Sequence, residues 1–170
     1  SAEYRKWEYC VQYRETDFNF VSRLMEQEGI YYYFEHEGGK HTLVLADAYG
    51  AHAPLPGYEE IAYRPPADRT LDEHIYDWNL SKSVQSGTCK IGAFHFMKPK
   101  ADLGVESSVI QQHDHEDFEI YDYPGEYEVK GDGDTYARIR MEELQTDYQV
   151  VRGEGFSRGI AVGSLFTLTD

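Results

Sequence analysis

Residues 11–36 read VQYRETDFNFVSRLMEQEGIYYYFEH, and this stretch predicts a strand, a helix and a second strand in close succession. Thr16 or Asp17 can accept a hydrogen bond from a free N–H group of the first helical turn, and Gly29 supplies the left-handed residue that ends a helix. The apolar residues between these two ends fall on one helical face: Phe20, Val21, Leu24 and Met25. The pattern therefore predicts an amphipathic helix.

A hairpin is expected directly after this helix. Residues 30–34 form an aromatic strand, residues 37–40 turn the chain, and residues 41–47 return as the partner strand. Because side chains of a strand alternate between its two faces, Tyr31 and Tyr33 separate from their neighbouring rings. This favours core packing and a protein interface over a flat carbohydrate or peptide platform. We expect Leu24 to be buried and to anchor the helix on the hairpin.

The remainder of the chain predicts a connector and a second set of strands. Glycines and prolines interrupt residues 50–74, and residues 98–116 show no clear period and predict a long loop. Strand patterns cover residues 75–80, 88–96, 118–123, 149–156 and 164–169.

A second helix is expected near residues 135–147, with Asp132-Gly133-Asp134 as its cap. Ala137, Met141 and Leu144 share one face of this helix and predict the side that packs. Pro124 and Gly125 end the strand that precedes it.

Several strings, in order along nearly the whole chain, resemble the VgrG family, the spike proteins of bacterial type VI secretion systems, and the related hub proteins of contractile phage tails. Beyond residues 11–36, the resemblance rests on residues 55–57 (LPG), 63–65 (YRP), 121–127 (YDYPGEY), 137–145 (ARIRMEELQ) and 163–168 (GSLFTL).

The resemblance implies a structural hub, or base, of a homotrimeric spike that docks on the hexameric Hcp tube and contacts baseplate proteins. A contracting sheath would propel tube and spike into a neighbouring cell, with effectors carried by regions outside residues 1–170. The chain would be part of a longer protein, held in the bacterial cytoplasm before firing and secreted by the type VI system without a signal peptide.

Together these observations predict the α+β class. The expected parts are a strand-helix-hairpin subdomain at residues 1–49, a connector at 50–74 and a hub domain at 75–170. The resemblance implies that the last part is a partly open, mainly antiparallel β-barrel of the contractile phage-tail hub type, with the second helix packed on it.

Charge and composition exclude several classes of function. The net charge of -15 repels phosphate backbones, so nucleic acid is not an expected partner. No apolar run approaches the roughly 20 residues that span a bilayer, which argues against stable membrane insertion. The start of the sequence has no secretory signal pattern. Cys10 and Cys89 lie far apart without metal-ligand spacing, which favours two reduced thiols.

The most suggestive catalytic string is Gly155-Phe156-Ser157-Arg158-Gly159, which matches the nucleophile-elbow pattern. An elbow requires a helix directly after the serine and a later histidine, but residues 160–165 predict turn and strand and no histidine follows His115. Glu142 and Glu143 are neighbours on a helix and point about 100° apart, so they do not form a glycosidase pair. The sequence predicts no enzyme and no catalytic residue.

The alternative function is a metal- or ligand-binding domain that uses residues 113–117. His113, His115 and Asp117 are weak candidate ligands, because imidazoles and carboxylates on one loop suit divalent metals. A solvated acidic loop is the favoured interpretation. The string from His36 to His41 has one residue too many for a helical zinc motif and lies on the expected hairpin. No metal and no cofactor is expected.

Overall fold

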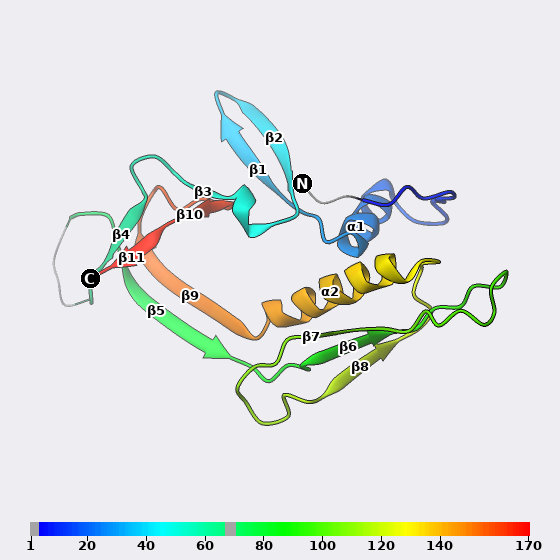
Figure 1. Ribbon diagram of the computed structural model, residues 1–170. Helices are drawn as coiled ribbons and strands as arrows, with labels where there is room; N and C mark the ends of the chain where they lie inside the picture. Colours follow the sequence, from blue (N-terminus) through cyan, green and yellow to red (C-terminus); the bar gives the residue numbers. More distant parts are fainter. Residues whose placement is uncertain (1–3, 67–70) are drawn as a thin grey trace. The chain divides into compact units, whose positions relative to one another are not determined.

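The computed structural model describes residues 4–66 and 71–170. Along the chain, as labelled in Figure 1, the elements are α1 (Asp17–Gln27), β1 (Tyr31–Glu37), β2 (Lys40–Ala46), the 3-10 helix η1 (Tyr49–Ala51), β3 (Ala53–Pro54), β4 (Glu60–Tyr63), β5 (His74–Lys82), β6 (Thr88–Ile91), β7 (Val105–Ser108), β8 (Glu119–Asp122), α2 (Lys130–Thr146), β9 (Gln149–Phe156), β10 (Ser164–Leu165) and β11 (Thr167–Thr169).

The chain divides into two compact units, each discontinuous in sequence. The first combines Ile30–Leu80 with Val151–Asp170, and the second combines residues 4–29 with Ser81–Val150. The predicted boundaries at residues 49 and 74 divide the chain into consecutive segments, whereas each of these units combines segments that are distant in sequence. The three-part division stays a prediction.

The hairpin of the first unit forms as predicted. β1 and β2 pair antiparallel, with Tyr31 opposite Ala46 and Glu37 opposite Lys40. Two glycines with φ of +56° and +80° make the turn between them, which suits the tight loop that matches strand twist.

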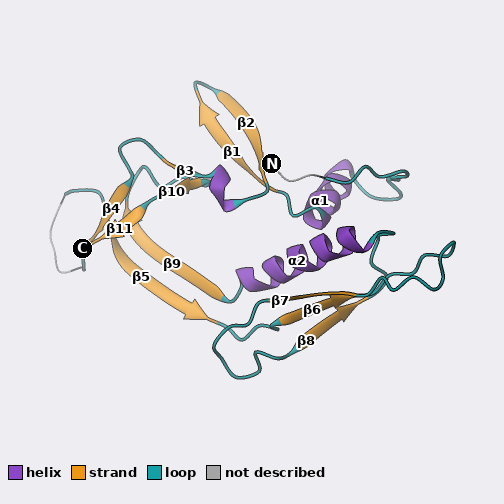
Figure 2. Cartoon of the chain, in the orientation of Figure 1, coloured by secondary structure: helices purple, strands orange, loops and turns teal. Residues whose placement is uncertain are grey.

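The other strands of this unit form a four-stranded sheet in the order β11-β4-β5-β9 and a small sheet of β10 with β3. β5 and β9 run side by side, and both curve along their length (Figure 2). β4 pairs in parallel with both β11 and β5, and β10 pairs in parallel with β3. The segment predicted as a connector thus supplies two strands, of two and four residues, which are too short to show a period.

In the second unit, α2 packs on a three-stranded sheet in the order β7-β6-β8 (Figure 1). The predicted helical face is confirmed: Ala137 and Met141 are fully buried, and Leu144 packs at the edge of the core. The buried core consists of Cys89, Ile91, Leu103, Val105, Tyr127, Tyr136, Ala137, Ile139 and Met141. Cys10 and Cys89 are both free, and burial raises the pKa of the Cys89 thiol.

Tyr127 connects the sheet of the second unit to the loops around it. Its hydroxyl lies 3.0 Å from the carbonyl oxygen of Ile91 and 2.5 Å from that of Leu103, to which it donates. Gly125 leaves room for this ring, because a Cβ there would lie only 2.3 Å from a Tyr127 ring carbon. Pro124, which precedes it, is exposed and follows a cis peptide bond.

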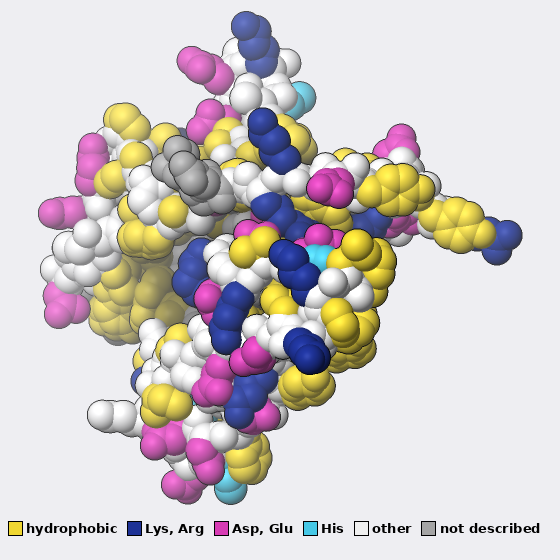
Figure 3. All heavy atoms as spheres, turned by 45° about the vertical axis from the view of Figure 1, so that its right-hand side comes forward, with side chains coloured by type: hydrophobic (Ala, Val, Ile, Leu, Met, Phe, Trp, Pro, Cys, Tyr) yellow, Lys and Arg dark blue, Asp and Glu magenta, His cyan; other side chains and the backbone are white. Residues whose placement is uncertain are grey.

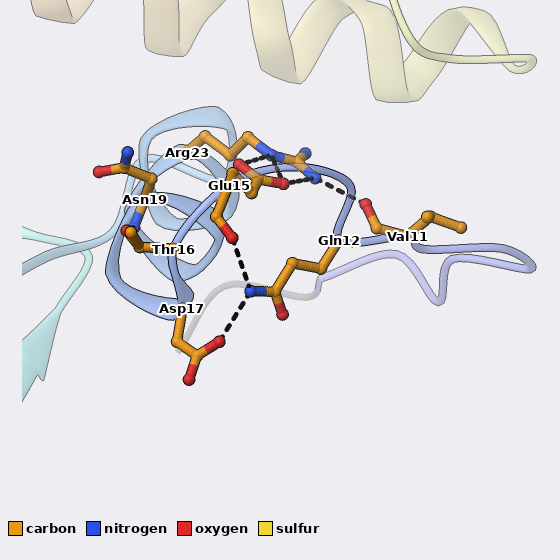
Figure 4. A network of polar contacts seen from close by, with 7 residues as sticks. All are labelled: Val11, Gln12, Glu15, Thr16, Asp17, Asn19 and Arg23. Carbon is orange, nitrogen blue, oxygen red and sulfur yellow. Dashed lines mark hydrogen bonds and ion pairs between the residues drawn. The ribbon is translucent and has the colours of Figure 1, made fainter.

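The two predicted ends of α1 are confirmed. The Thr16 side chain accepts a hydrogen bond from the Asn19 N–H at 3.2 Å, and Gly29 has a φ of +70° just after the helix. Side chains fix the segment before the helix (Figure 4): the Arg23 guanidinium donates to the Val11 carbonyl at 2.9 Å and pairs with Glu15 at 2.9 Å. This bond to Arg23 lowers the pKa of Glu15.

The prediction of a strand before α1 is wrong, since residues 4–16 contain no strand. The Gln12 side chain reaches the Asp17 carboxylate at 2.7 Å, and the Val11 carbonyl accepts from a side chain instead of a strand partner. Arg14 has a φ of +51°, which is incompatible with a regular strand.

The burial expected for the first helix is also wrong. Phe20 and Leu24 are half-buried, Val21 is about half exposed, and none of the α1 residues is fully buried. The contacts described for the end of α1 run to α2, where Arg140 pairs with Glu26 at 3.1 Å. Anchoring of α1 on the hairpin stays a prediction.

Leu24→Ala should therefore lower the free energy of unfolding by roughly 1 kcal/mol, about half the value of burying a whole leucine side chain. The matched control is Val21→Ala at an exposed position of the same helix, with an expected change within about 0.5 kcal/mol. Denaturant unfolding of the two variants provides the comparison. A loss of about 2–5 kcal/mol for Leu24→Ala would show full burial instead.

The α+β class is correct, but the sheets are mixed instead of mainly antiparallel, and they do not form a closed barrel within the described residues. β7 lies inside the segment predicted as a long loop. Asp132-Gly133-Asp134 lies inside α2 instead of before it: the helix begins after Val129, which gives no side-chain cap. Tertiary packing of short segments overrides their weak local patterns.

Candidate assembly surfaces

One face of the β1–β2 hairpin is anchored within the first unit. Tyr31 and Tyr33 share this face, and both contact the ring of His52. His52 Nδ1 lies 2.9 Å from the Gly163 carbonyl oxygen, which can only accept, so Nδ1 carries the proton. His52 Nε2 lies 2.6 Å from the Tyr31 hydroxyl oxygen, within hydrogen-bond distance. These contacts fix the orientation of the hairpin in its unit.

The opposite face, which we call the hairpin outer face, is apolar and exposed. Tyr32 lies across from Leu45, and Phe34 lies across from Leu43. All four side chains are more than one third exposed. Apolar rings and aliphatic chains gathered on one exposed sheet face are typical of protein interfaces. The aromatic run predicted an interface, and its presence on this face stays a prediction.

His36 and His41 lie opposite each other at the tip of the hairpin, with their Nδ1 atoms 2.5 Å apart. The pair sits on two strands instead of one helix, and within residues 4–66 and 71–170 no three His, Cys, Asp or Glu side chains gather to hold a metal ion.

The loop of the alternative function does not bring its candidate ligands together. The His113 ring packs against Tyr148 at 5.7 Å, while the His115 ring stacks on Phe118 at 4.6 Å. Asp117 is exposed. Each imidazole thus has its own aromatic partner, which gives the loop a packing role.

Ser157 follows the last residue of β9 and precedes a turn, so the strand-to-helix geometry of a nucleophile elbow is absent there. Its hydroxyl is buried and has no hydrogen-bond partner among the described residues. A histidine that could act as a base is absent from the later sequence.

A cluster in the second unit holds the segment before α1. The Arg5 guanidinium lies 4.3 Å from the centre of the Trp7 ring and 5.4 Å from that of Tyr136. Glu28 Oε1 accepts from Trp7 Nε1 at 3.1 Å and from the Tyr136 hydroxyl at 2.9 Å. Burial, and then the bond to Glu28, raises the pKa of Tyr136. These contacts hold the segment before α1 against α2.

Sequence reasoning missed a second exposed apolar group, in the loop after β6. Phe94, Phe96 and Met97 are 61%, 75% and 71% exposed. Apolar side chains also lie beside basic ones on the face shown in Figure 3. The sequence signal that could have identified this group is three large apolar residues within four positions, followed by Lys98 and Lys100.

None of the helices in the described part of the chain is long and apolar enough to cross a bilayer. The described surfaces therefore offer interface patches and show no assembled catalytic or metal site among the residues named above.

Comparison with known proteins matches the whole chain to one family model, described as phage tail baseplate hub (GPD), over residues 1–170. Three Pseudomonas aeruginosa proteins are similar: type VI secretion system spike protein VgrG1b, 51% identical over 99% of this chain; VgrG1c, 50% identical over 100%; and VgrG1a, 49% identical over 98%. The chain spans 23%, 24% and 26% of their respective lengths.

Proposed function

Because the chain belongs to the phage tail baseplate hub family, we propose that it is the structural hub module of a trimeric type VI secretion spike. In this role it docks on the hexameric Hcp tube, contacts baseplate proteins and aids puncture and effector delivery. The observation that carries the proposal is the family match over residues 1–170, together with sequence identities of 51%, 50% and 49% to three spike proteins.

The surfaces support an assembly role. The hairpin outer face offers apolar area on a rigid, anchored hairpin, and interface cores are rich in such aromatic residues. A hub must hold its shape under mechanical load, and a buried core with tight contacts around Tyr127 meets that need.

The proposed role is non-enzymatic. Ser157 lacks the helix and the histidine that an elbow requires, and His113 and His115 have separate aromatic partners. Effectors would associate through regions outside residues 1–170. The proposed location is the bacterial cytoplasm before firing, followed by secretion through the type VI system without a signal peptide.

A chimera provides the test. The matching segment of the Pseudomonas aeruginosa spike protein VgrG1b is replaced by residues 1–170, and release of the Hcp tube protein into the medium is measured. We expect the chimera to support release. Introducing Ser157→Ala should leave release unchanged, because the proposed role needs no nucleophile.

The matched negative control is a chimera with Met141→Lys, which places a charge in the core of the second unit and should abolish release through misfolding. A chimera that accumulates and trimerises normally but releases no tube protein would contradict the proposed function.

A further inference from the structure

The backbone of the loop between β6 and β7 is held by hydrogen bonds, and the loop exposes apolar side chains to solvent. Lys98 N–H donates to the His95 carbonyl at 3.0 Å, and Met97 N–H donates to His95 Nδ1 at 3.2 Å. The base of the loop is fixed by a bond from Gly125 N–H to the Gly92 carbonyl at 2.7 Å. Phe94, Phe96 and Met97 are exposed although the backbone beneath them is held in place. We call residues 92–101 the basic loop.

The charge of this loop is opposite to that of the chain. Residues 92–101 contain two lysines and no Asp or Glu, whereas the whole chain has a net charge of -15. Two other cations of the same unit are already neutralised: Lys90 pairs with Glu119 at 2.5 Å, and Arg140 pairs with Glu143 at 2.8 Å. Lys98 and Lys100 form no ion pair with the described residues, so their charge is available to a partner.

The second unit carries a complementary surface, residues 109–119, which we call the acidic end. It contains four acidic residues and no Lys or Arg. Glu119 is paired with Lys90, which leaves Asp114, Glu116 and Asp117. Asp114 and Asp117 are exposed, and in the sequence they lie between Ile110 and Phe118, whose apolar side chains are also exposed. Each surface thus combines exposed apolar side chains with charge of one sign, and the two signs are opposite.

These two surfaces lie at opposite ends of one sheet. β6 pairs antiparallel with β7 and parallel with β8, so Thr88 at the start of β6 lies beside Ser108 and Glu119. The acidic end, which joins β7 to β8, is therefore at the start of β6, and the basic loop is at its other end (Figure 1). The four-residue strands separate them by about 13 Å. One copy of the chain therefore cannot bring its own two surfaces together.

We propose that the basic loop of one copy docks on the acidic end of a second copy of this chain. The contact is head to tail, since two different surfaces meet, and such a contact forms a ring when its rotation closes. It buries Phe94, Phe96 and Met97 against Ile110 and Phe118, and it brings opposite charges together on a chain whose remaining surface repels its copies. The inference rests on the proposed hub role, because the copies of a trimeric spike must contact one another.

Cross-linking between two purified variants tests the contact. One carries Phe96→Cys and the other carries Ile110→Cys, each with a different tag and with the exposed Cys10 replaced by Ser. We expect oxidation of the mixture to give a dimer that carries both tags. The matched control mixes Phe96→Cys with Val162→Cys, an exposed apolar position in the other unit. The control yield should be about tenfold lower, the factor that 1.4 kcal/mol of docking free energy provides.

Charge reversal provides the second arm. Lys98→Glu with Lys100→Glu in every copy should reduce the cross-linked yield to that of the control pair, because like charges then face each other. Adding Asp114→Lys and Asp117→Lys to the same chains restores the opposite signs and should restore the yield. Equal yields for the test and control pairs, or no rescue by the fourfold variant, would overturn the proposal and point to a partner other than a second copy.

This test is separable from that of the proposed function. If the cross-link forms specifically but the spike chimera releases no tube protein, the hub role is overturned and the contact between copies still stands. Tube release by the chimera without specific cross-linking would overturn the contact alone.

Discussion

Met141→Ala should lower the free energy of unfolding of the second unit by about 2–5 kcal/mol, the cost of truncating a large side chain that leaves a cavity. Met141 is fully buried on α2, within the core that this helix forms with β6 and β7. Fluorescence of Trp7 reports on this unit in a Trp78→Phe background, because the chain has two tryptophans and they lie in different units.

The matched control is Met97→Ala, which removes the same side chain from a position that is 71% exposed. Its effect should stay within about 0.5 kcal/mol. Similar losses for the two variants would mean that Met141 does not occupy the core.

Gly163→Ala should destabilise the first unit by about 2–5 kcal/mol, through two separate causes. Gly163 has a φ of +84°, which costs a residue with a Cβ about 1–2 kcal/mol. In addition, a Cβ at this position would lie within 2.4 Å of a Tyr33 ring carbon, so the ring must move, at about 1–3 kcal/mol. Denaturant unfolding followed by Trp78 fluorescence, in a Trp7→Phe background, measures the loss.

Gly39→Ala separates the two causes. Gly39 has a nearly equal φ of +80° in the hairpin turn, and apart from its two chain neighbours no atom of the described residues lies within 4 Å of the place where its Cβ would stand. Only the conformational cost of about 1–2 kcal/mol applies there. If both variants lose the same stability, the Tyr33 ring does not rest on Gly163 as described.

The sequence predicted the structure best where two local sequence signals indicated the same element. At α1, the Thr16 cap, the apolar period and the positive φ of Gly29 all point to the same helix. The hairpin combines alternating side chains with a two-glycine turn. At α2, the packing face of Ala137 and Met141 was evident even though the helix starts earlier than expected.

The sequence could not predict features that depend on distant partners. β3 has two residues, and its pairing is supplied by β10 near the end of the chain. β7 is a strand because it lies beside β6, not because its own residues show a period. The burial of Leu24 was overestimated, because a period identifies the apolar face of a helix but not how much protein covers it.

The pairing of β4 has a consequence for how this protein is made. Its partner β5 follows closely, but its other partner β11 comes from residues more than a hundred positions later. On the ribosome, one edge of β4 therefore has no partner until β11 has been synthesised. Contacts so distant in sequence slow folding, and an unpaired edge in the nascent chain can recruit a wrong strand. Chaperone dependence during synthesis is the expected result.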